Sequence, residues 1–242
     1  MNSSSVKNIV ASTKAKLSNI AKQHGWDYQH ILTRYATERF LYRLSISPYR
    51  EQFILKGGNL FIIWMNGINA RPTIDTDLLR HGDASPEKLE QIFFELASAA
   101  PQESDGVVYD PSSIKIKAIR ETTEYGGTRI ELMSYLGNIE IRLQFDIGIG
   151  DIITPAPELK EFPVLLNGKA PCLQVYPMTS VIAEKAQIII SLGTITSRMK
   201  DFYDIWFLSQ QFEHDFELLS REPCKIRCPR FLNGILMRNG SF

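Results

Sequence analysis

The chain has 242 residues, of which 44% are hydrophobic and 22% are charged, so it can bury a sizeable core and is not intrinsically disordered. Lys plus Arg and Asp plus Glu both number 27, and this zero net charge excludes a general polyanion binder. No segment reaches the roughly 18 consecutive apolar residues of a membrane span, and the N-terminus lacks the apolar block of a secretory signal. Three cysteines cannot complete a disulfide framework in a chain of this length, which favours a reduced compartment. Together, these features lead us to expect a cytoplasmic protein with no membrane partner.

The N-terminal part carries a local excess of positive charge. Residues 1–50 hold eight basic side chains against the acidic Asp27 and Glu38. The basic residues are Lys7, Lys14, Lys16, Lys22, Arg34, Arg39, Arg43 and Arg50. This excess could face nucleic acid, or it could be the solvated surface of amphipathic helices.

Apolar periodicity predicts the first elements. Helical spacing favours helices over residues 6–24 and 28–44, the second with Phe40 facing inward and Glu38 and Arg39 facing outward. The next predicted elements are a turn or short helix from Pro48, a buried strand over 53–55 that stops at 56–58, and two helical turns over 59–65 that end at Asn66-Gly67. Alternation over 73–79 then predicts a strand with Asp75 and Asp77 on one face.

The middle of the chain predicts one more helix and then a sheet. Ser85 and Pro86 mark the start of a helix that runs to about Ala99. Three extended runs follow, over residues 113–121, 128–136 and 138–148, with hairpin turns at Gly126-Gly127 and Gly137-Asn138. The last run alternates most clearly and carries Asp146 near the end of its polar face. We therefore expect an α+β fold with an antiparallel meander.

The C-terminal third predicts a change of structure. Prolines at 155, 157 and 163 favour an irregular connector over residues 151–173. Helical spacing returns from Met178 to Leu192, with Gly193 as a stop, and Ser197 can cap a further helix to about Gln210. The predicted segments are a core with N-terminal helices over 1–150, a connector over 151–177, a helical segment over 178–220 and an atypical tail over 221–242.

The acidic strand face suggests a metal site. Carboxylates two residues apart on one strand lie about 6 to 7 Å apart and repel by roughly 3 kcal/mol at an effective dielectric near 20. A cation between Asp75 and Asp77 would offset this cost. Mg²⁺ prefers such oxygen ligands, commonly together with substrate phosphates. The alternative is an exposed strand edge whose acids discourage aggregation.

Two further features favour the metal site. Gly57-Gly58 leave a strand and enter a helix, where backbone amides can approach a phosphate, although such a pair by itself more often forms a turn. If the strand of Asp146 neighbours the strand of Asp75, three carboxylates converge and can hold one or two metal ions. Taken alone, Asp146 also fits an ordinary solvent-facing strand residue.

Five short strings carry a family resemblance. LKGGNL at residues 55–60 and RPTIDTDL at residues 71–78 resemble the Gly-Gly and Asp-x-Asp signature of polymerase-beta-type nucleotidyltransferases. QFDIG at 144–148, EKA at 184–186 and KDFYDI at 200–205 narrow the resemblance to the AbiEii/AbiGii toxin family. Members of this family are the nucleotidyltransferase halves of bacterial toxin-antitoxin and phage-defence pairs.

The resemblance implies a nucleotidyltransferase-type mixed or antiparallel sheet, flanked by helices, with a helical C-terminal part that closes the cleft. It also implies a role for each matching residue. Asp75, Asp77 and Asp146 would hold Mg²⁺, Gly57, Gly58 and Asn59 would contact the NTP, Lys185 would neutralise phosphate charge, and Lys200 with Asp204 would shape the nucleotide pocket. Such a division suits phosphoryl transfer, which depends mainly on positioning and charge stabilisation.

Simpler readings exist for the helical residues. Lys185 could be a surface lysine, and Lys200 can pair with Asp204 four residues along a helix. Tyr203, Trp206, Phe207 and Leu208 fit a hydrophobic core better than a platform for a nucleotide base.

The resemblance implies transfer of an NMP from an NTP, with Mg²⁺, to a macromolecular acceptor, either tRNA or a protein. The protein would act as the toxin of a pair whose antitoxin is a separate chain. One alternative is a non-catalytic protein of the same fold that binds nucleotide or a partner, and another is a metal-dependent nuclease.

Two departures from the family pattern stand out. Thr76 occupies the middle of Asp-x-Asp, where relatives usually carry an apolar residue, which we interpret as a less buried face. Residues 221–242 lack a helical apolar period, so we expect a poorly ordered tail and suspect truncation or a change of reading frame. A zinc site built from Cys172, Cys224, Cys228 and His214 is disfavoured because no second closely spaced ligand pair exists.

Overall fold

The structure is a computed structural model, and it describes residues 3–67, 73–100, 104–119, 127–150, 153, 155–192 and 199–211. The predictions for the tail over 221–242, the turn residue Gly126, the stop at Gly193 and the cap at Ser197 lie outside these residues. The chain forms two compact units: residues 1–151 with 158–175, and residues 152–157 with 176–242. The predicted segment boundaries stay predictions.

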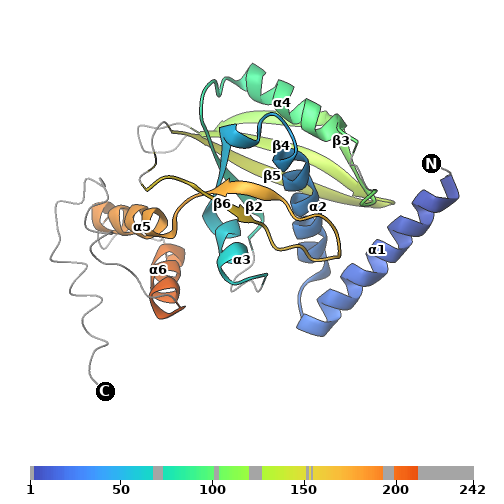
Figure 1. Cartoon of the computed structure of the whole chain (residues 1–242), viewed down its shortest axis with the longest axis horizontal. Coiled ribbons are helices and arrows are strands. Elements are labelled where there is room, and N and C mark those ends of the chain that lie inside the picture. The colour runs from blue at the N-terminus through green and yellow to red at the C-terminus, as the bar shows by residue number, and fades with distance from the viewer. Residues whose placement is uncertain are drawn as a thin grey trace. The chain divides into compact units, whose positions relative to one another are not determined.

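The first unit is built on one mixed sheet. Among the described residues, seven strands lie in the order β3-β4-β5-β2-β1-β7-β6. Their bounds are β1 Phe53–Lys56, β2 Asp75–Arg80, β3 Val107–Ile119, β4 Gly127–Leu136, β5 Ile139–Ile149, β6 Glu158–Glu161 and β7 Cys172–Val175. The meander β3-β4-β5 is antiparallel, as predicted, and forms the longest part of the sheet (Figure 1). The pairs β2-β5 and β1-β7 are parallel.

The first unit also contains four described helices. They are α1 Ser3–His24, α2 Tyr28–Ser45, α3 Leu60–Trp64 and α4 Pro86–Ser98, with 3₁₀ turns at Arg50–Gln52 and Gly57–Asn59. Phe40 of α2 and Phe93 of α4 pack against Phe145 of β5, with ring centroids 4.7 and 5.2 Å apart. All three rings are at most 1% exposed, so they mark the centre of the core. The α+β class and the predicted helices are therefore confirmed.

Strand β3 differs from its predicted extent. β3 begins six residues earlier than its apolar alternation suggested, and its register shifts between Asp110 and Lys115. Pro111 lies in this stretch, which a strand tolerates here because β3 is at the edge of the sheet.

The segment 151–173, predicted to be an irregular connector, contains β6 and the first half of β7. β7 pairs with β1 in parallel, and β6 pairs with β7 in antiparallel orientation. The prediction of irregular structure was wrong for these strands because both have only four residues, too few for alternation to show. β6 is exposed throughout, so it carries no apolar pattern at all.

The second unit contains two described helices, α5 Met178–Leu192 and α6 Met199–Gln211. Both lie where helical spacing predicted them. In the part of the chain that the structure describes, no helix is long and apolar enough to cross a membrane.

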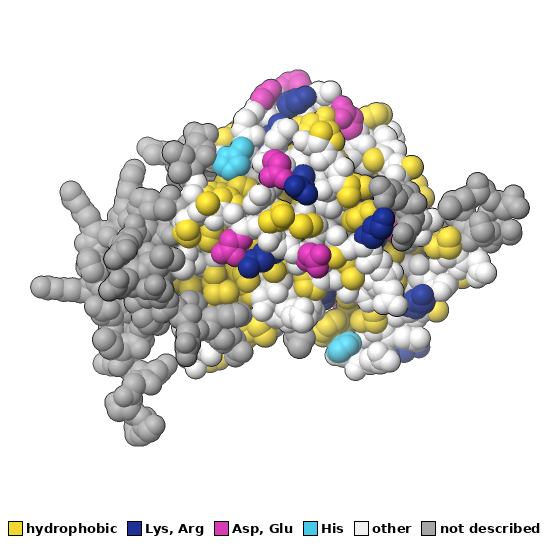
Figure 2. All heavy atoms as spheres, in the orientation of Figure 1, with side chains coloured by type: hydrophobic (Ala, Val, Ile, Leu, Met, Phe, Trp, Pro, Cys, Tyr) yellow, Lys and Arg dark blue, Asp and Glu magenta, His cyan; other side chains and the backbone are white. Residues whose placement is uncertain are grey.

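On the face shown in Figure 2, acidic and basic side chains are interspersed, and no large area carries charge of one sign only.

Candidate functional site

The three aspartates singled out from the sequence lie on two neighbouring strands. In the parallel pair β2-β5, Asp77 stands beside Asp146 and Asp75 stands beside Gln144. Neighbouring strands are about 4.8 Å apart, so Asp77 and Asp146 are adjacent on the sheet. The alternate residue Thr76 and its neighbour Phe145 are buried on the opposite face. The condition that the two acidic strands be neighbours is thus met, and all three aspartates share the polar face.

The glycine turn lies directly against this acidic face. Gly57 has a φ of +67°, and a Cβ atom at this position would come 1.8 Å from Oδ2 of Asp77. A Cβ atom on Gly58 would come 2.7 Å from the hydroxyl oxygen of Thr73. The turn therefore requires glycine at residue 57 for two reasons, its left-handed backbone and the space that the Asp77 carboxylate occupies. The predicted meeting of Gly-Gly and Asp-x-Asp at one end of the sheet is present.

Asn59 links the turn to the acidic strand. Its side-chain amide donates a hydrogen bond to the backbone carbonyl of Asp75 at 3.0 Å and lies 3.4 Å from the hydroxyl of Thr76. Asn59 is 5% exposed and Thr76 is 1% exposed. The interpretation of Thr76 as part of a less buried face was therefore wrong: a threonine suits this buried position because its hydroxyl accepts from Asn59. Asn59 acts here as a positioning residue for β2.

Arg129 is a site residue that the sequence interpretation missed. Its Nε and Nη2 atoms donate to the two carboxylate oxygens of Asp146 at 2.8 and 2.7 Å. Arg129 stands opposite Asp146 in the β4-β5 hairpin. A signal for this contact existed in the sequence, because the two-residue turn Gly137-Asn138 fixes the register of the whole hairpin.

A charged row crosses four strands at this level of the sheet. It runs from Arg129 through Asp146 and Asp77 to Lys56, which stands beside Asp77 in the β1-β2 pair. Two acids at the centre of the row are thus flanked by two bases. Lys56 also escaped the sequence analysis, although it directly precedes the glycine pair.

The donor atoms of the site fit a hard divalent cation. Asp75 and Asp77 are half-buried carboxylates on one strand, and such oxygen ligands are those that Mg²⁺ prefers. Across the residues that the structure describes, however, no three His, Cys, Asp or Glu side chains are grouped closely enough to hold a metal ion. Asp146 is paired with the guanidinium of Arg129 instead, so the assignment of metal to all three aspartates stays a prediction.

The second unit holds its own buried ion cluster. Lys185 on α5 pairs with Asp201 at 2.5 Å and with Asp204 at 2.9 Å, both on α6. The side chain of Asp204 is 0% exposed, whereas Lys200 is exposed one turn earlier. Lys185 is thus not a free surface lysine, and the structure brings it, rather than Lys200, to Asp204.

The aromatic residues of α6 divide between surface and core. Leu208 is buried, as predicted, but Tyr203 is 40% and Trp206 is 57% exposed among the described residues. The prediction that Tyr203 and Trp206 belong to the hydrophobic core was therefore wrong. The buried residues of α6, which include Asp201 and Asp204, form one stripe along the helix, and Tyr203 and Trp206 lie outside this stripe.

Comparison with known proteins identifies the family. A family model described as the AbiEii nucleotidyl transferase toxin of a type IV toxin-antitoxin system matches residues 39–224. The chain belongs to the AbiEii family. The match includes the glycine turn, all three aspartates and the Lys185 cluster. A search of curated proteins found no match.

Two solved structures share the fold of this AbiEii protein. JHP933 from Helicobacter pylori superposes with a TM-score of 0.52 at 17% identity, over 81% of this chain and 73% of that chain. An H. pylori protein studied as a candidate nucleotidyltransferase superposes with a TM-score of 0.51 at 16% identity, over 81% and 75%. At this identity the likeness establishes the nucleotidyltransferase-like fold.

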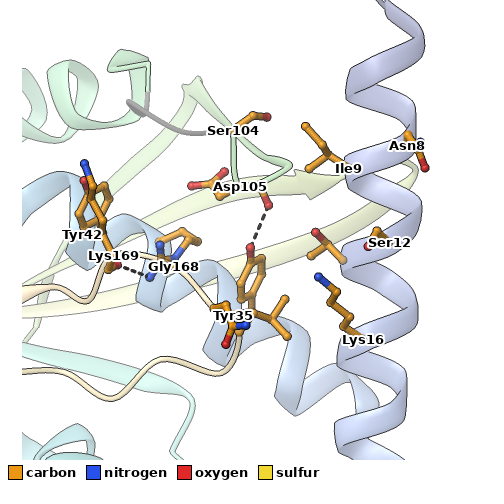
Figure 3. A pocket seen from close by; sticks show the side chains of 14 residues that line it. Asn8, Ile9, Ser12, Lys16, Tyr35, Tyr42, Ser104, Asp105, Gly168 and Lys169 are labelled. Carbon is orange, nitrogen blue, oxygen red and sulfur yellow. Dashed lines mark hydrogen bonds between the residues drawn. The ribbon is translucent and has the colours of Figure 1, made fainter.

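A cavity of about 490 Å³ lies elsewhere in the first unit of the AbiEii protein (Figure 3). It is lined by α1, α2 and residues 104–105 and 166–169, and none of the three aspartates lines it. Two hydrogen bonds seen in Figure 3 run from Tyr35 to the carbonyl of Asp105 at 2.9 Å and from Arg39 to the carbonyl of Lys169 at 3.1 Å. These contacts attach α2 to two surrounding loops.

Part of the basic excess in the N-terminal part is buried in such contacts. Arg34, Arg39 and Arg43 are at most 6% exposed, and each donates to backbone carbonyls of other segments. Glu38, which pairs with Arg39 at 2.8 Å, is 1% exposed. The prediction that Glu38 and Arg39 face outward was wrong, because α2 is packed on all sides and its charged residues pair within the protein. Three of the eight basic side chains of residues 1–50 are therefore buried, and the basic surface of this part of the chain is smaller than its composition suggests.

Glu38 should make stability depend on pH. Desolvation by burial raises its pKa from 4.5 to about 7, against the opposing effects of Arg39 and of the Leu165 amide. The folded chain thus keeps this proton up to higher pH than the unfolded chain, so raising the pH between these two values favours unfolding. We expect the urea midpoint of the wild type to fall from about pH 5 to about pH 8 by more than that of Glu38→Gln. Equal pH slopes for the two proteins would show that Glu38 ionises normally.

Proposed function

We propose that this protein transfers a nucleoside monophosphate from an NTP to a macromolecular acceptor, tRNA or protein, with Mg²⁺ bound at Asp75 and Asp77 and completed by Asp146. The observation that carries the proposal is the parallel register of β2 and β5. It sets Asp77 beside Asp146, on the face against which Gly57 also packs. Membership of a nucleotidyl transferase toxin family supports the same chemistry.

The proposed reaction joins the acceptor to the α-phosphate of the NTP. The acceptor hydroxyl oxygen forms a bond to the α-phosphorus, the bond from that phosphorus to the bridging oxygen of pyrophosphate breaks, and the hydroxyl proton passes to the carboxylate of Asp146. Bound Mg²⁺ would neutralise charge that develops on the phosphate oxygens. The backbone amides of Gly57 and Gly58 would donate to the triphosphate. Asn59 holds the turn to β2 and so keeps these groups in register with the acids.

The residues of the second unit enter the proposal as nucleotide contacts. Lys185 would neutralise phosphate charge, and Lys200 with Asp204 would shape the pocket for the nucleotide. In support, Lys185 is held by two acids, which fixes the position of its ammonium group. An ammonium group carries three N–H donors, so a lysine held by two carboxylates retains one donor for a phosphate.

The proposed physiological role is that of the toxin in a type IV toxin-antitoxin pair, in which a separate antitoxin opposes it. Modification of the acceptor would be the toxic event, and such a pair would serve in phage defence. The family supports the partnership with an antitoxin.

Label transfer tests the proposed activity. The purified protein is incubated with each of the four α-labelled NTPs and Mg²⁺, together with total RNA or with total protein. We expect one nucleotide to label one acceptor class, and EDTA to abolish the label because the phosphoryl chemistry needs the divalent ion. Mg²⁺-dependent NTP binding without transfer would instead identify a binding protein. Shortened RNA would identify a nuclease.

A further inference from the structure

Arg129 is bound to the carboxylate of Asp146, which is one of the ligands of the proposed metal site. Its two nitrogen atoms engage both oxygens of Asp146, at 2.8 and 2.7 Å. Such two-point contacts between a guanidinium and a carboxylate are stronger and more directional than single ones. The side chain of Asp146 is only 17% exposed and that of Arg129 is 36% exposed, so the pair is partly shielded from water. Each oxygen of this carboxylate therefore already accepts one hydrogen bond from a cation that a metal ion would have to displace or share.

The surroundings direct Arg129 to Asp146 rather than to the other nearby acid. Glu131 lies two residues along β4, but it is held by Lys117 at 2.9 Å and by Arg142 at 2.6 Å. The hydrogen bonds to Asp146 are the main cause that raises the pKa of Arg129, and Asp75 adds to this effect. The Arg129 guanidinium is therefore stabilised in its charged form by the negative charge of the acidic face.

We propose that Arg129 is the built-in counter-ion of the acidic site, which holds Asp146 while no divalent ion is bound and releases it when the ion arrives. This inference rests on the proposed function. Release requires only side-chain rotation, because the backbone pairing of β4 and β5 does not depend on the contact between the side chains of Arg129 and Asp146. Arg129 is thus a positioning residue: it offsets the repulsion between Asp77 and Asp146 in the free protein and competes with the metal for Asp146.

Metal titration of the full chain tests this competition without any turnover. Mn²⁺ serves as the probe, and its binding is followed by electron paramagnetic resonance of the free ion. We expect Arg129→Gln to bind Mn²⁺ at least about fivefold more tightly than the wild type, because the competing cation is gone. Arg129→Lys keeps the charge but not the two-point contact, so its affinity should lie between the two.

Arg142→Gln is the matched control. It removes an arginine from the same strand face as Asp146, but four residues away, about 13 Å along β5, where salt screens the charge. Lys117 still holds Glu131 in this variant, so Glu131 stays occupied and Arg129 keeps Asp146 as its partner. We expect its Mn²⁺ affinity to stay within about twofold of the wild type. Equal affinities for Arg129→Gln and Arg142→Gln would overturn the inference, as would an Arg129→Lys variant indistinguishable from the wild type.

A further variant separates this inference from the proposed function. Asp75→Ala should lose Mn²⁺ binding if the acidic face is the metal site. If the wild type binds no Mn²⁺, or if Asp75→Ala binds it normally, the proposed function fails. If Asp75→Ala loses binding but Arg129→Gln behaves like Arg142→Gln, the proposed function stands and only the role of Arg129 is wrong.

Discussion

Asp75→Ala is expected to lower nucleotide transfer by at least about 10³-fold, because charge stabilisation by a bound metal ion contributes several kcal/mol to such reactions. Stability should not suffer. The side chain of Asp75 is half-buried beside another carboxylate, and the like-charge repulsion relieved by its removal offsets the lost attraction to Arg129. The backbone carbonyl that accepts from Asn59 is retained in the variant. The measurements are the initial rate of label transfer and the midpoint of thermal unfolding, which we expect to be equal to that of the wild type or higher.

Glu140→Gln provides the matched control for this prediction. Glu140 is an exposed acid on β5, on the same face as Asp146 and at the far end of the strand. Removing its charge should leave transfer within about twofold of the wild type, since a surface charge at that distance is screened. If Asp75→Ala retained more than about a tenth of the activity, catalysis by the acidic strand would be refuted.

Gly57→Ala should also lower transfer strongly, for a steric reason. The new methyl group would lie 1.8 Å from the Oδ2 atom of Asp77, so either the turn or the carboxylate must move. A displacement of about 1 Å in a catalytic group costs on the order of 10²-fold in rate. The left-handed backbone adds roughly 1–2 kcal/mol of strain for any residue with a Cβ atom. We therefore expect a loss of at least 10²-fold in activity together with a lower thermal midpoint.

Gly25→Ala separates strain from displacement. Gly25 has nearly the same backbone angle, with a φ of +65°, but a Cβ atom there would meet nothing within 4 Å. This variant should lose roughly 1 kcal/mol of stability and keep its full activity. If both variants lost stability equally and neither lost activity, the contact between Gly57 and Asp77 would have no functional role.

Local chemistry determined most of the first unit's elements. The helices α1, α2 and α4 and the β4-β5 hairpin follow from apolar spacing, from the start signal at Ser85 and Pro86, and from the glycine turn at Gly137. Each of these signals acts over a few residues, so the sequence contains it completely. The same holds for the contact between Arg129 and Asp146, whose register the two-residue turn sets in advance.

The burial of charged and polar side chains could not be predicted from local sequence patterns. Glu38 and Arg39 have the polarity of an outward face, yet α2 buries both because loops from distant parts of the chain surround it. Thr76 is similar, since its partner Asn59 comes from another element. In each case a hydrogen bond to a residue far away in sequence satisfies the polar group, and no periodicity records such a partner.

The sequence by itself determined the family, through short strings that match at the glycine turn, the acidic strand and the last helix, and it determined which face of β2 carries the two aspartates. Only the tertiary structure decided that β5 lies beside β2 in parallel with Asp146 at the level of Asp77. The reason is physical: α4, β3 and β4 separate the two strands along the chain, so their register is set by packing of Phe145 against α2 and α4 rather than by any turn.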